Sequence, residues 1–302
     1  MAADDIPFDR TLAAKPDEVQ TLSPLVRRLI ANNGGPFTFT GTCSYIVGHG
    51  EVAVVDPGPA DPSHIAAVLA AVRGETVRHI LVTHTHRDHA GGAALLKAAT
   101  GAEVLGCPKR PPRAQDPGLP ALDAAFDLRY VPDRALAEGD AVEGPGYGLV
   151  TVETPGHTSD HLAFALRGED ALFSGDHVMA WSTSVVAPPD GSMRSYMASL
   201  RKLHDRGDAI YWPGHGGPVL NPRAFVKALL VHRQWREAAI LRRVAAGDST
   251  VPALVESIYR DLAPSLRGAA GLSVLAHLVD LVADGQVEAD GPATLRATYA
   301  PA

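Results

Sequence analysis

The sequence has little of several features that would place a protein in a particular class. Only two cysteines, Cys43 and Cys107, occur in 302 residues, too few for a framework of disulfide bonds. The formal net charge is −7, so no overall positive field attracts nucleic acid. No run of about 18 apolar residues occurs, and the first residues lack the basic and apolar regions of a signal peptide. We therefore expect a cytoplasmic protein that does not enter a membrane.

The composition is otherwise that of a globular chain. Hydrophobic residues make up 46% of the sequence, enough for a large core in one big domain or in two unequal ones. The 29 glycines and 24 prolines indicate many short connections between elements.

The most informative stretch reads Val-Thr-His-Thr-His-Arg-Asp-His-Ala-Gly-Gly and begins at Val82. Four side chains of the kinds that bind metal fall within six positions: His84, His86, Asp88 and His89. The apolar residues 80–82 before them predict a buried strand, and Gly91-Gly92 behind them predicts a turn into a helix. Imidazole nitrogens and carboxylate oxygens suit a borderline ion such as Zn²⁺. The sequence therefore predicts a metal-binding loop at a strand end.

Three later strand ends each place one more residue of this kind beside a glycine: His157, Asp176 and His215. Glycine lets the backbone turn sharply there and bring the side chains toward a shared point. The full set of seven suits two ions that share a bridging carboxylate and a bridging water.

The remaining stretches give less specific expectations. The residues Phe37 to Thr40 predict a strand, and 25–30 predict a strand or a short helix. Asp56 either supports a metal site or forms a turn with Pro57-Gly58, and the turn is the favoured interpretation. Arg110 and Arg113 lie in a stretch that is either a substrate-side loop or, as we favour, a solvated surface loop.

The motif and the spacing of the later ligands resemble the metallo-β-lactamase superfamily over roughly residues 20–220. Its signature T-H-x-H-x-D-H stands at residues 83–89, and its later ligands match the three strand ends. The resemblance implies an α/β fold, a four-layer αβ/βα sandwich with the metal site at one edge, in a domain of residues 1–222. It also implies a ligand set: His84, His86 and His157 for one ion, Asp88, His89 and His215 for the other, and Asp176 between them.

Further motifs resemble one branch of this superfamily, the β-lactamase-like protein 2 group. They are Gly41-Thr42, Gly156-His157-Thr158 with His161, residues 211–216, and residues 232–237. The branch includes a mitochondrial single-stranded-RNA endonuclease and fungal polyketide thioesterases. Where its members commonly have Asn after Gly-Thr, this chain has Cys43. His161 either orients a metal ligand or is an ordinary buried histidine.

The same branch carries a small C-terminal module that resembles a winged helix, which we place at residues 223–302. Its second predicted helix, residues 272–284, contains no Lys or Arg. We therefore expect no sequence-specific DNA binding. The module would instead pack on the sandwich and shape the cleft, or mediate a homodimer.

Together these features predict a metal-dependent hydrolase with two divalent ions, zinc first and iron or manganese as alternatives. Two ions would lower the pKa of the water between them from about 15.7 to about 7, and Asp88 would orient that nucleophile or hold its proton. The favoured substrate is a small ester or thioester. A phosphodiesterase or single-stranded-RNA endonuclease is the alternative, with Arg233 and Arg236 as cations for flanking phosphates. A purely structural metal site in a non-catalytic protein is a minor third option.

Overall fold

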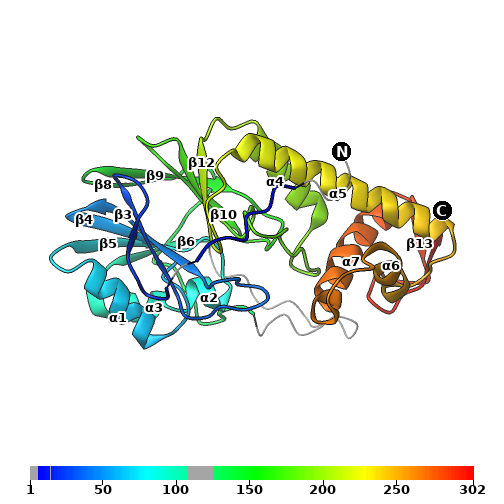
Figure 1. Cartoon of the computed structure of the whole chain (residues 1–302), viewed down its shortest axis with the longest axis horizontal. Coiled ribbons are helices and arrows are strands. Elements are labelled where there is room, and N and C mark those ends of the chain that lie inside the picture. Colours follow the sequence, from blue (N-terminus) through cyan, green and yellow to red (C-terminus); the bar gives the residue numbers. More distant parts are fainter. Residues whose placement is uncertain (1–5, 14, 108–124) are drawn as a thin grey trace.

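Two β-sheets form the centre of the computed structural model, which describes residues 6–13, 15–107 and 125–302 (Figure 1). The first sheet contains, in spatial order, β1 (Gln20–Thr21), β2 (Val26–Ile30), β3 (Cys43–His49), β4 (Glu51–Val55), β5 (Thr76–Leu81), β6 (Glu103–Gly106) and β7 (Arg134–Ala135). The second contains, in spatial order, β12 (Ile210–Pro213), β11 (Ala171–Gly175), β10 (Leu162–Leu166), β9 (Tyr147–Glu153) and β8 (Ala141–Gly144). Both sheets mix parallel and antiparallel pairs.

Helices cover the outer faces of the two sheets. They are α1 (Pro62–Ala71), α2 (Arg87–Ala90), α3 (Ala93–Thr100), α4 (Met193–His204) and α5 (Pro222–Ala245). Buried side chains of α1 and α3 share a core cluster with the first sheet, and those of α4 and α5 share one with the second. This arrangement confirms the predicted αβ/βα sandwich.

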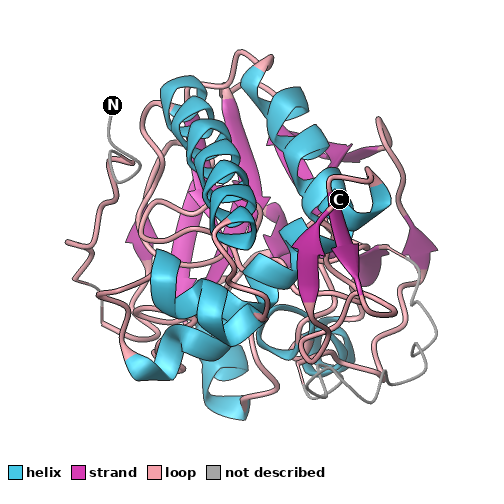
Figure 2. Cartoon of the chain, turned by 90° about the vertical axis from the view of Figure 1, so that its right-hand side faces the viewer, coloured by secondary structure: helices cyan, strands magenta, loops and turns pink. Residues whose placement is uncertain are grey.

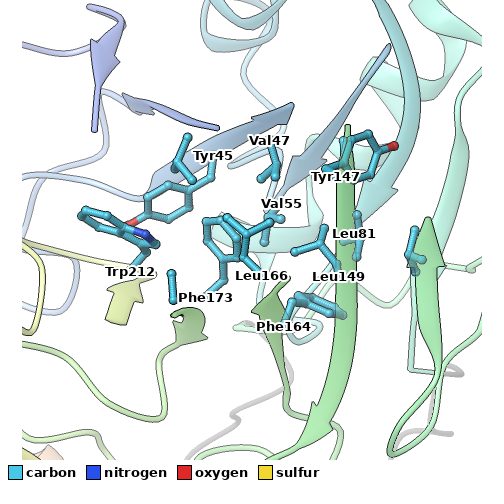
Figure 3. Packing of buried hydrophobic residues seen from close by; sticks show 14 of the residues in the cluster. Tyr45, Val47, Val55, Leu81, Tyr147, Leu149, Phe164, Leu166, Phe173 and Trp212 are labelled. Atoms are coloured by element: carbon cyan, nitrogen blue, oxygen red, sulfur yellow. The ribbon is translucent and has the colours of Figure 1, made fainter. Parts of the chain in front are cut away.

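The inner faces of the sheets meet in a third cluster that contains side chains from both (Figure 3). The rings of Tyr45 and Phe173 face each other across it, with centroids 5.1 Å apart. The Tyr45 hydroxyl donates to the carbonyl of Pro213 at 2.7 Å. The first sheet thereby holds the end of β12, the strand that leads into the His215 loop.

Most of the expected elements form, and one expectation is wrong. The ambiguous residues 25–30 contain strand β2. The residues Phe37 to Thr40 form a turn and not a strand, because the amide of Phe39 donates to Gly35 and its φ is 55°. The propensity of Phe and Thr for strands is overridden there by local turn hydrogen bonds. Arg110 and Arg113 lie outside the described residues.

The C-terminal module is linked to the sandwich by α5, which runs from one to the other (Figure 1). The first half of α5 packs with the second sheet, whereas its second half packs with α6 (Val251–Ile258) and α7 (Arg267–Ala283). A short 3-10 helix, η2 (Pro264–Leu266), precedes α7. A hairpin of β13 (Val287–Ala289) and β14 (Tyr299–Pro301) completes the module beside the C-terminus (Figure 2).

One helical stretch among the described residues, Pro264–Ala283, is long and apolar enough to cross a membrane by length and composition. Half of its apolar window is buried inside the protein. Leu278 and Leu281 of this stretch pack in the core of the module. A core helix of a globular protein can have the same length and composition as a membrane span. The stretch is therefore only weak evidence for a membrane span.

Candidate metal centre

The motif after β5 is held in a loop that continues into the short helix α2. Helix α2 begins directly after His86 and carries Asp88 and His89. Gly91 at its end permits close packing, because a Cβ there would lie 2.3 Å from the carbonyl oxygen of Arg87. The chain therefore turns at the segment that carries the four ligand-type side chains.

The other three predicted ligands follow strands of the second sheet. His157 comes after β9, Asp176 after β11 and His215 after β12. The edges of the two sheets are joined here, since the amide of Cys43 donates to Gly214 at 2.8 Å. All seven side chains therefore converge on the junction of the sheets.

One group contains His84, His86, His157 and Asp176, with one ligand atom of each within 4.8 Å of the others. His86 Nδ1 lies 2.9 Å from His84 Nε2 and 3.3 Å from His157 Nε2. His157 Nε2 lies 3.8 Å from Asp176 Oδ2. Ligands about 2.1 Å from a tetrahedral zinc ion are about 3.4 Å from one another. The spacing and the donor atoms fit such an ion.

The second group contains Asp88, His89 and His215. His215 Nε2 lies 3.2 Å from His89 Nε2 and 3.3 Å from Asp88 Oδ2. Asp176 faces this group as well, with Oδ2 3.4 Å from His215 Nε2 and Oδ1 3.6 Å from His89 Nε2. Asp176 therefore lies between the two groups.

Four of the histidines have an Nδ1 atom that faces away from the groups and is hydrogen-bonded. The pairs are His84 with Thr83 Oγ1 (3.0 Å), His89 with Asp56 Oδ2 (2.8 Å), His157 with Val185 O (2.6 Å) and His215 with Gly41 O (3.3 Å). An Nδ1 that donates a proton leaves the Nε2 lone pair free for a cation. The surroundings therefore select the tautomer that a metal ligand needs.

Asp56 is part of this support, contrary to the favoured expectation that it only forms a turn. Its carboxylate accepts from the amide of Thr83, from the Thr83 hydroxyl and from His89, each at 2.8 Å. Its φ of 50° turns the chain after β4 and aims the carboxylate at the motif. Asp56 therefore both forms the turn after β4 and orients His89 through a hydrogen bond.

Sequence analysis missed a second support, which involves Asn33 and Thr42. The Thr42 hydroxyl donates to Asp88 Oδ2 at 3.1 Å. The Asn33 side chain accepts from the Thr42 amide and donates to the Thr42 hydroxyl, both at 2.9 Å. The Gly-Thr motif was the available signal, but the separation of nine positions between Asn33 and Thr42 concealed the pairing.

His161 is placed to orient Asp176, one of its two predicted roles. Its Nε2 accepts from the Asp176 amide at 3.1 Å, so its Nδ1 donates to Thr154 Oγ1 at 2.8 Å. Burial, reinforced by neighbouring histidines, holds the pKa of His161 well below its usual range. The ring stays neutral, as an acceptor of a backbone hydrogen bond must.

The electrostatics differ between the two groups: a positively charged imidazole is disfavoured at His86 and favoured at His89 and His215. Burial lowers the pKa of His86 to about 3. Burial would also lower the pKa of His89 and of His215, but the adjacent carboxylates raise both, that of His215 to about 10. Burial would raise the pKa of Asp88 and Asp176, yet the two neighbouring imidazoles hold both below the usual range. Both aspartates are therefore carboxylates at neutral pH.

The two arginines predicted as substrate cations lie elsewhere. Arg233 is 2% exposed and donates to the carbonyl of Ser184, so it does not flank the mouth of the site. Arg236 lies over the ring of Tyr259, 4.4 Å from its centroid, and its Nε is 3.3 Å from His232 Nε2. It belongs to the junction of α5 with the module.

A cavity of about 480 Å³ opens beside the second group. It is lined by Pro59, Ala60, Arg87, Asp88, Gly91, Asp127, Leu128 and Arg129. The Asp88 side chain remains 28% exposed. Its carboxylate can therefore be reached from outside, and the cavity is in the size range of small-molecule sites.

Trp181 packs near His215, against Gly216. Its ring stacks on Phe39 with centroids 5.1 Å apart and an interplanar angle of 12°. A Cβ on Gly216 would lie 2.7 Å from Cδ1 of Trp181. These rings form an apolar wall beside the second group.

Comparison with known families agrees with this fold. The metallo-beta-lactamase superfamily matches residues 37–215, and the beta-lactamase associated winged helix domain matches residues 250–293. The chain belongs to the metallo-β-lactamase superfamily, a family of hydrolases whose fold implies divalent metal ions. The prediction of the superfamily and of the winged-helix module is confirmed.

Curated relatives and solved structures extend the similarity to most of the chain. A beta-lactamase-like protein 2 homolog of Caenorhabditis elegans is 31% identical over 281 residues, 90% of this chain and 89% of its own length. An atrochrysone carboxyl ACP thioesterase of Aspergillus fumigatus is 32% identical over 260 residues, 80% of this chain and 76% of its own. The crystal structure of a metallo-beta-lactamase family protein from Thermus thermophilus aligns with a TM-score of 0.76 and 25% identity, covering 93% of this chain and 100% of that one.

Proposed function

We propose that the chain is a binuclear metal-dependent hydrolase that cleaves an ester or thioester. The observation that carries the proposal is the position of Asp176, whose Oδ2 lies 3.8 Å from His157 in one group and 3.4 Å from His215 in the other. A carboxylate between two sets of ligands suits two neighbouring cations. His84, His86 and His157 would hold one ion, and Asp88, His89 and His215 the other.

Zinc fits the nitrogen-rich donor set best, although iron and manganese accept the same ligands. Two bound divalent ions would supply hydroxide at neutral pH and polarise the carbonyl of the substrate. The residues of the chain prepare this chemistry by burying the ligands and fixing their tautomers.

Asp88 would act on the nucleophile directly. Its carboxylate is ionised at neutral pH, reachable from the cavity and held in orientation by the Thr42 hydroxyl. It can therefore accept a hydrogen bond from the attacking water and orient that water for attack. We assign it the role of the catalytic carboxylate.

The thioester is favoured over a phosphodiester by the surroundings of the site. The relative from Aspergillus fumigatus is called a thioesterase, and a further relative from Emericella nidulans is also named so. Arg233 is buried away from the mouth, and Phe39 and Trp181 supply an apolar wall beside His215. Both features suit an apolar acyl group.

A phosphodiesterase is the second candidate because Arg87 and Arg129 line the cavity beside Asp88. Cations at that position could pair with phosphates next to the one being cleaved. Arg87 is partly engaged, since its Nε donates to the carbonyl of Phe126 at 2.9 Å.

Two measurements test the proposal. Elemental analysis of purified, metal-replete protein should find about two divalent ions per chain, and one or none would contradict the binuclear site. A screen should then compare a neutral N-acetylcysteamine thioester, bis(p-nitrophenyl) phosphate and a short single-stranded RNA. We expect turnover of the thioester, lost in His84→Ala protein. Turnover of the RNA or the phosphodiester alone would select the second candidate.

We also infer that residues 1–222 form the catalytic domain and that the module of residues 223–302 supports it and does not read DNA. Helix α7 carries Arg267 at its start and no other basic residue except His277. Salt-dependent duplex binding by the full chain with nanomolar affinity would contradict this.

A further inference from the structure

Arg233 is a buried cation for which the proposed reaction has no use. It lies on α5, is 2% exposed, and has no carboxylate partner among the described residues. Its Nε also has no hydrogen-bond partner. Burying an unpaired charge is costly, so a protein keeps such a residue where its contacts have a specific task.

The contacts of Arg233 lead to one loop. Its Nη2 donates to the carbonyl of Ser184, and its guanidinium lies over the ring of Tyr196, 5.0 Å from the centroid. The Tyr196 hydroxyl donates to the carbonyl of His177 at 3.0 Å. Arg233 therefore anchors the loop that follows β11, both at Ser184 and through Tyr196 at His177.

The loop after β11 contacts two of the proposed metal ligands, Asp176 and His157, on the side away from the metal groups. Ser184 Oγ lies 2.5 Å from the carbonyl oxygen of Asp176. The carbonyl of the next residue, Val185, accepts from His157 Nδ1 at 2.6 Å. The positions of Asp176 and His157 therefore both depend on the position of Ser184 and Val185.

We propose that Arg233 is a positioning residue that holds this loop so that His157 and Asp176 face the metals. The inference rests on the proposed metal centre. The positive charge of Arg233 interacts with the carbonyl of Ser184 and the ring face of Tyr196, and not with a substrate. An arginine suits this task because its planar fork can donate to a carbonyl while its face lies on an aromatic ring.

The test measures zinc affinity, by competition with a chelator, in Arg233→Met protein. We expect affinity about 10–100-fold weaker than in the unsubstituted protein, the effect typical of losing a residue that orients metal ligands. The visible absorption of the cobalt(II)-loaded protein should change too, because the first group would be distorted. Arg233→Lys keeps a donor for the carbonyl and should recover part of the affinity.

Two control variants separate positioning from general destabilisation. Arg242→Met removes an exposed arginine of the same helix and should leave zinc affinity unchanged. Leu254→Ala opens the core of the module, where Leu254 is fully buried, and should lower the melting temperature without weakening zinc binding. Equal loss of affinity in Leu254→Ala and Arg233→Met would reduce Arg233 to a stabilising residue.

Ser184→Ala provides an independent route to the same conclusion, also if Arg233→Met does not fold. It should weaken zinc binding and combine with Arg233→Lys non-additively, because both act on one loop. Unchanged zinc affinity and cobalt spectrum in the Arg233 and Ser184 variants would overturn the proposal, as would a raised KM alone, which would return Arg233 to substrate binding. Failure of the unsubstituted protein to bind zinc, iron or manganese would instead contradict the proposed function.

Discussion

Oδ2 of Asp56 lies 2.8 Å from Nδ1 of His89, so a residue that ends strand β4 orients a proposed metal ligand 33 positions later. The same oxygen accepts from the Thr83 hydroxyl, whose oxygen in turn is 3.0 Å from His84 Nδ1. One carboxylate therefore supports a histidine in each of the two groups.

Asp56→Asn should weaken zinc binding by about 10–100-fold, with the stronger effect at the second group. Asparagine tolerates the φ of 50° that Asp56 adopts, so the change removes charge without straining the turn. Zinc titration against a chelator measures the effect. Asp61→Asn, at the exposed start of α1, is the control and should bind zinc normally. Unchanged zinc affinity in Asp56→Asn would show that the hydrogen bond to His89 is dispensable.

Asp88→Ala should remove most activity, with kcat reduced by about 100-fold or more, because it disturbs the second ion and the orientation of the nucleophile together. Steady-state kinetics at saturating zinc measure this. Asp205→Asn, on a side chain that is 82% exposed after α4, should behave like the unsubstituted protein. A fully active Asp88→Ala enzyme would rule out the binuclear mechanism.

Gly214→Ala should reduce metal content and activity although position 214 holds no ligand. A Cβ there would lie 2.5 Å from Asp176 Oδ1 and 2.6 Å from His89 Cε1, so both side chains must move. We expect zinc affinity to fall about 10-fold or more. Gly217→Ala is the matched control, since the nearest atom to its Cβ is Asp9 Oδ2 at 3.7 Å. Equal zinc binding in the two variants would mean that the site adapts freely.

The folded protein should lose stability as the pH falls from about 6.5 toward 3, and His232 should account for part of the loss. Burial, together with Arg233 and Arg236, lowers the pKa of His232 to about 3. Above about 6.5 the ring is neutral in both states; below that pH the unfolded chain gains a proton that the folded chain excludes. The folded state is therefore destabilised progressively down to its own pKa.

Urea unfolding of chelator-treated protein at about pH 7.5 and about pH 5 measures this effect. His232→Gln, which can still accept from Arg236, should lose less stability between the two conditions than the unsubstituted protein. His49→Gln changes an exposed histidine of the first sheet and should lose as much as the unsubstituted protein. Equal losses in all three proteins would refute the role of His232.

Arg129→Ala distinguishes the two candidate substrates. The Arg129 side chain is 87% exposed at the cavity beside Asp88. For a neutral thioester, KM should change by less than about twofold, because no charge on the substrate needs a partner. For a phosphodiester, KM should rise about 10-fold and its salt dependence should weaken. Arg167→Ala, at an exposed position away from that cavity, gives the baseline.

The sequence predicts the regular elements well because their signals are local. The turn into a helix predicted at Gly91-Gly92 leads into α3, whose spacing of apolar residues is visible in a single segment. The histidine motif is equally local. The superfamily, the sandwich and the winged-helix module follow from these patterns and from their resemblance to known families.

The supports of the site could not be predicted in this way because they join residues that are distant in the sequence. The Thr42 hydroxyl meets Asp88 across 46 positions, and Arg233 reaches Ser184 across 49. Neither pair shares a helix or a strand register. Arg233 looked like a surface cation because α5 has several charged residues, and only the packing of α5 against the sandwich shows that it is buried.

Four of the seven proposed ligands follow β5 in the first sheet, and the other three follow strands of the second. Neither half of the sandwich can therefore bind the ions alone, and binding selects the fully assembled chain. Each tenfold rise in free zinc above the dissociation constant of a site would add about 1.4 kcal/mol per bound ion to the free energy of unfolding. The stability of the protein would follow the supply of metal, and a cell short of zinc would hold a chain that opens more often and is degraded sooner.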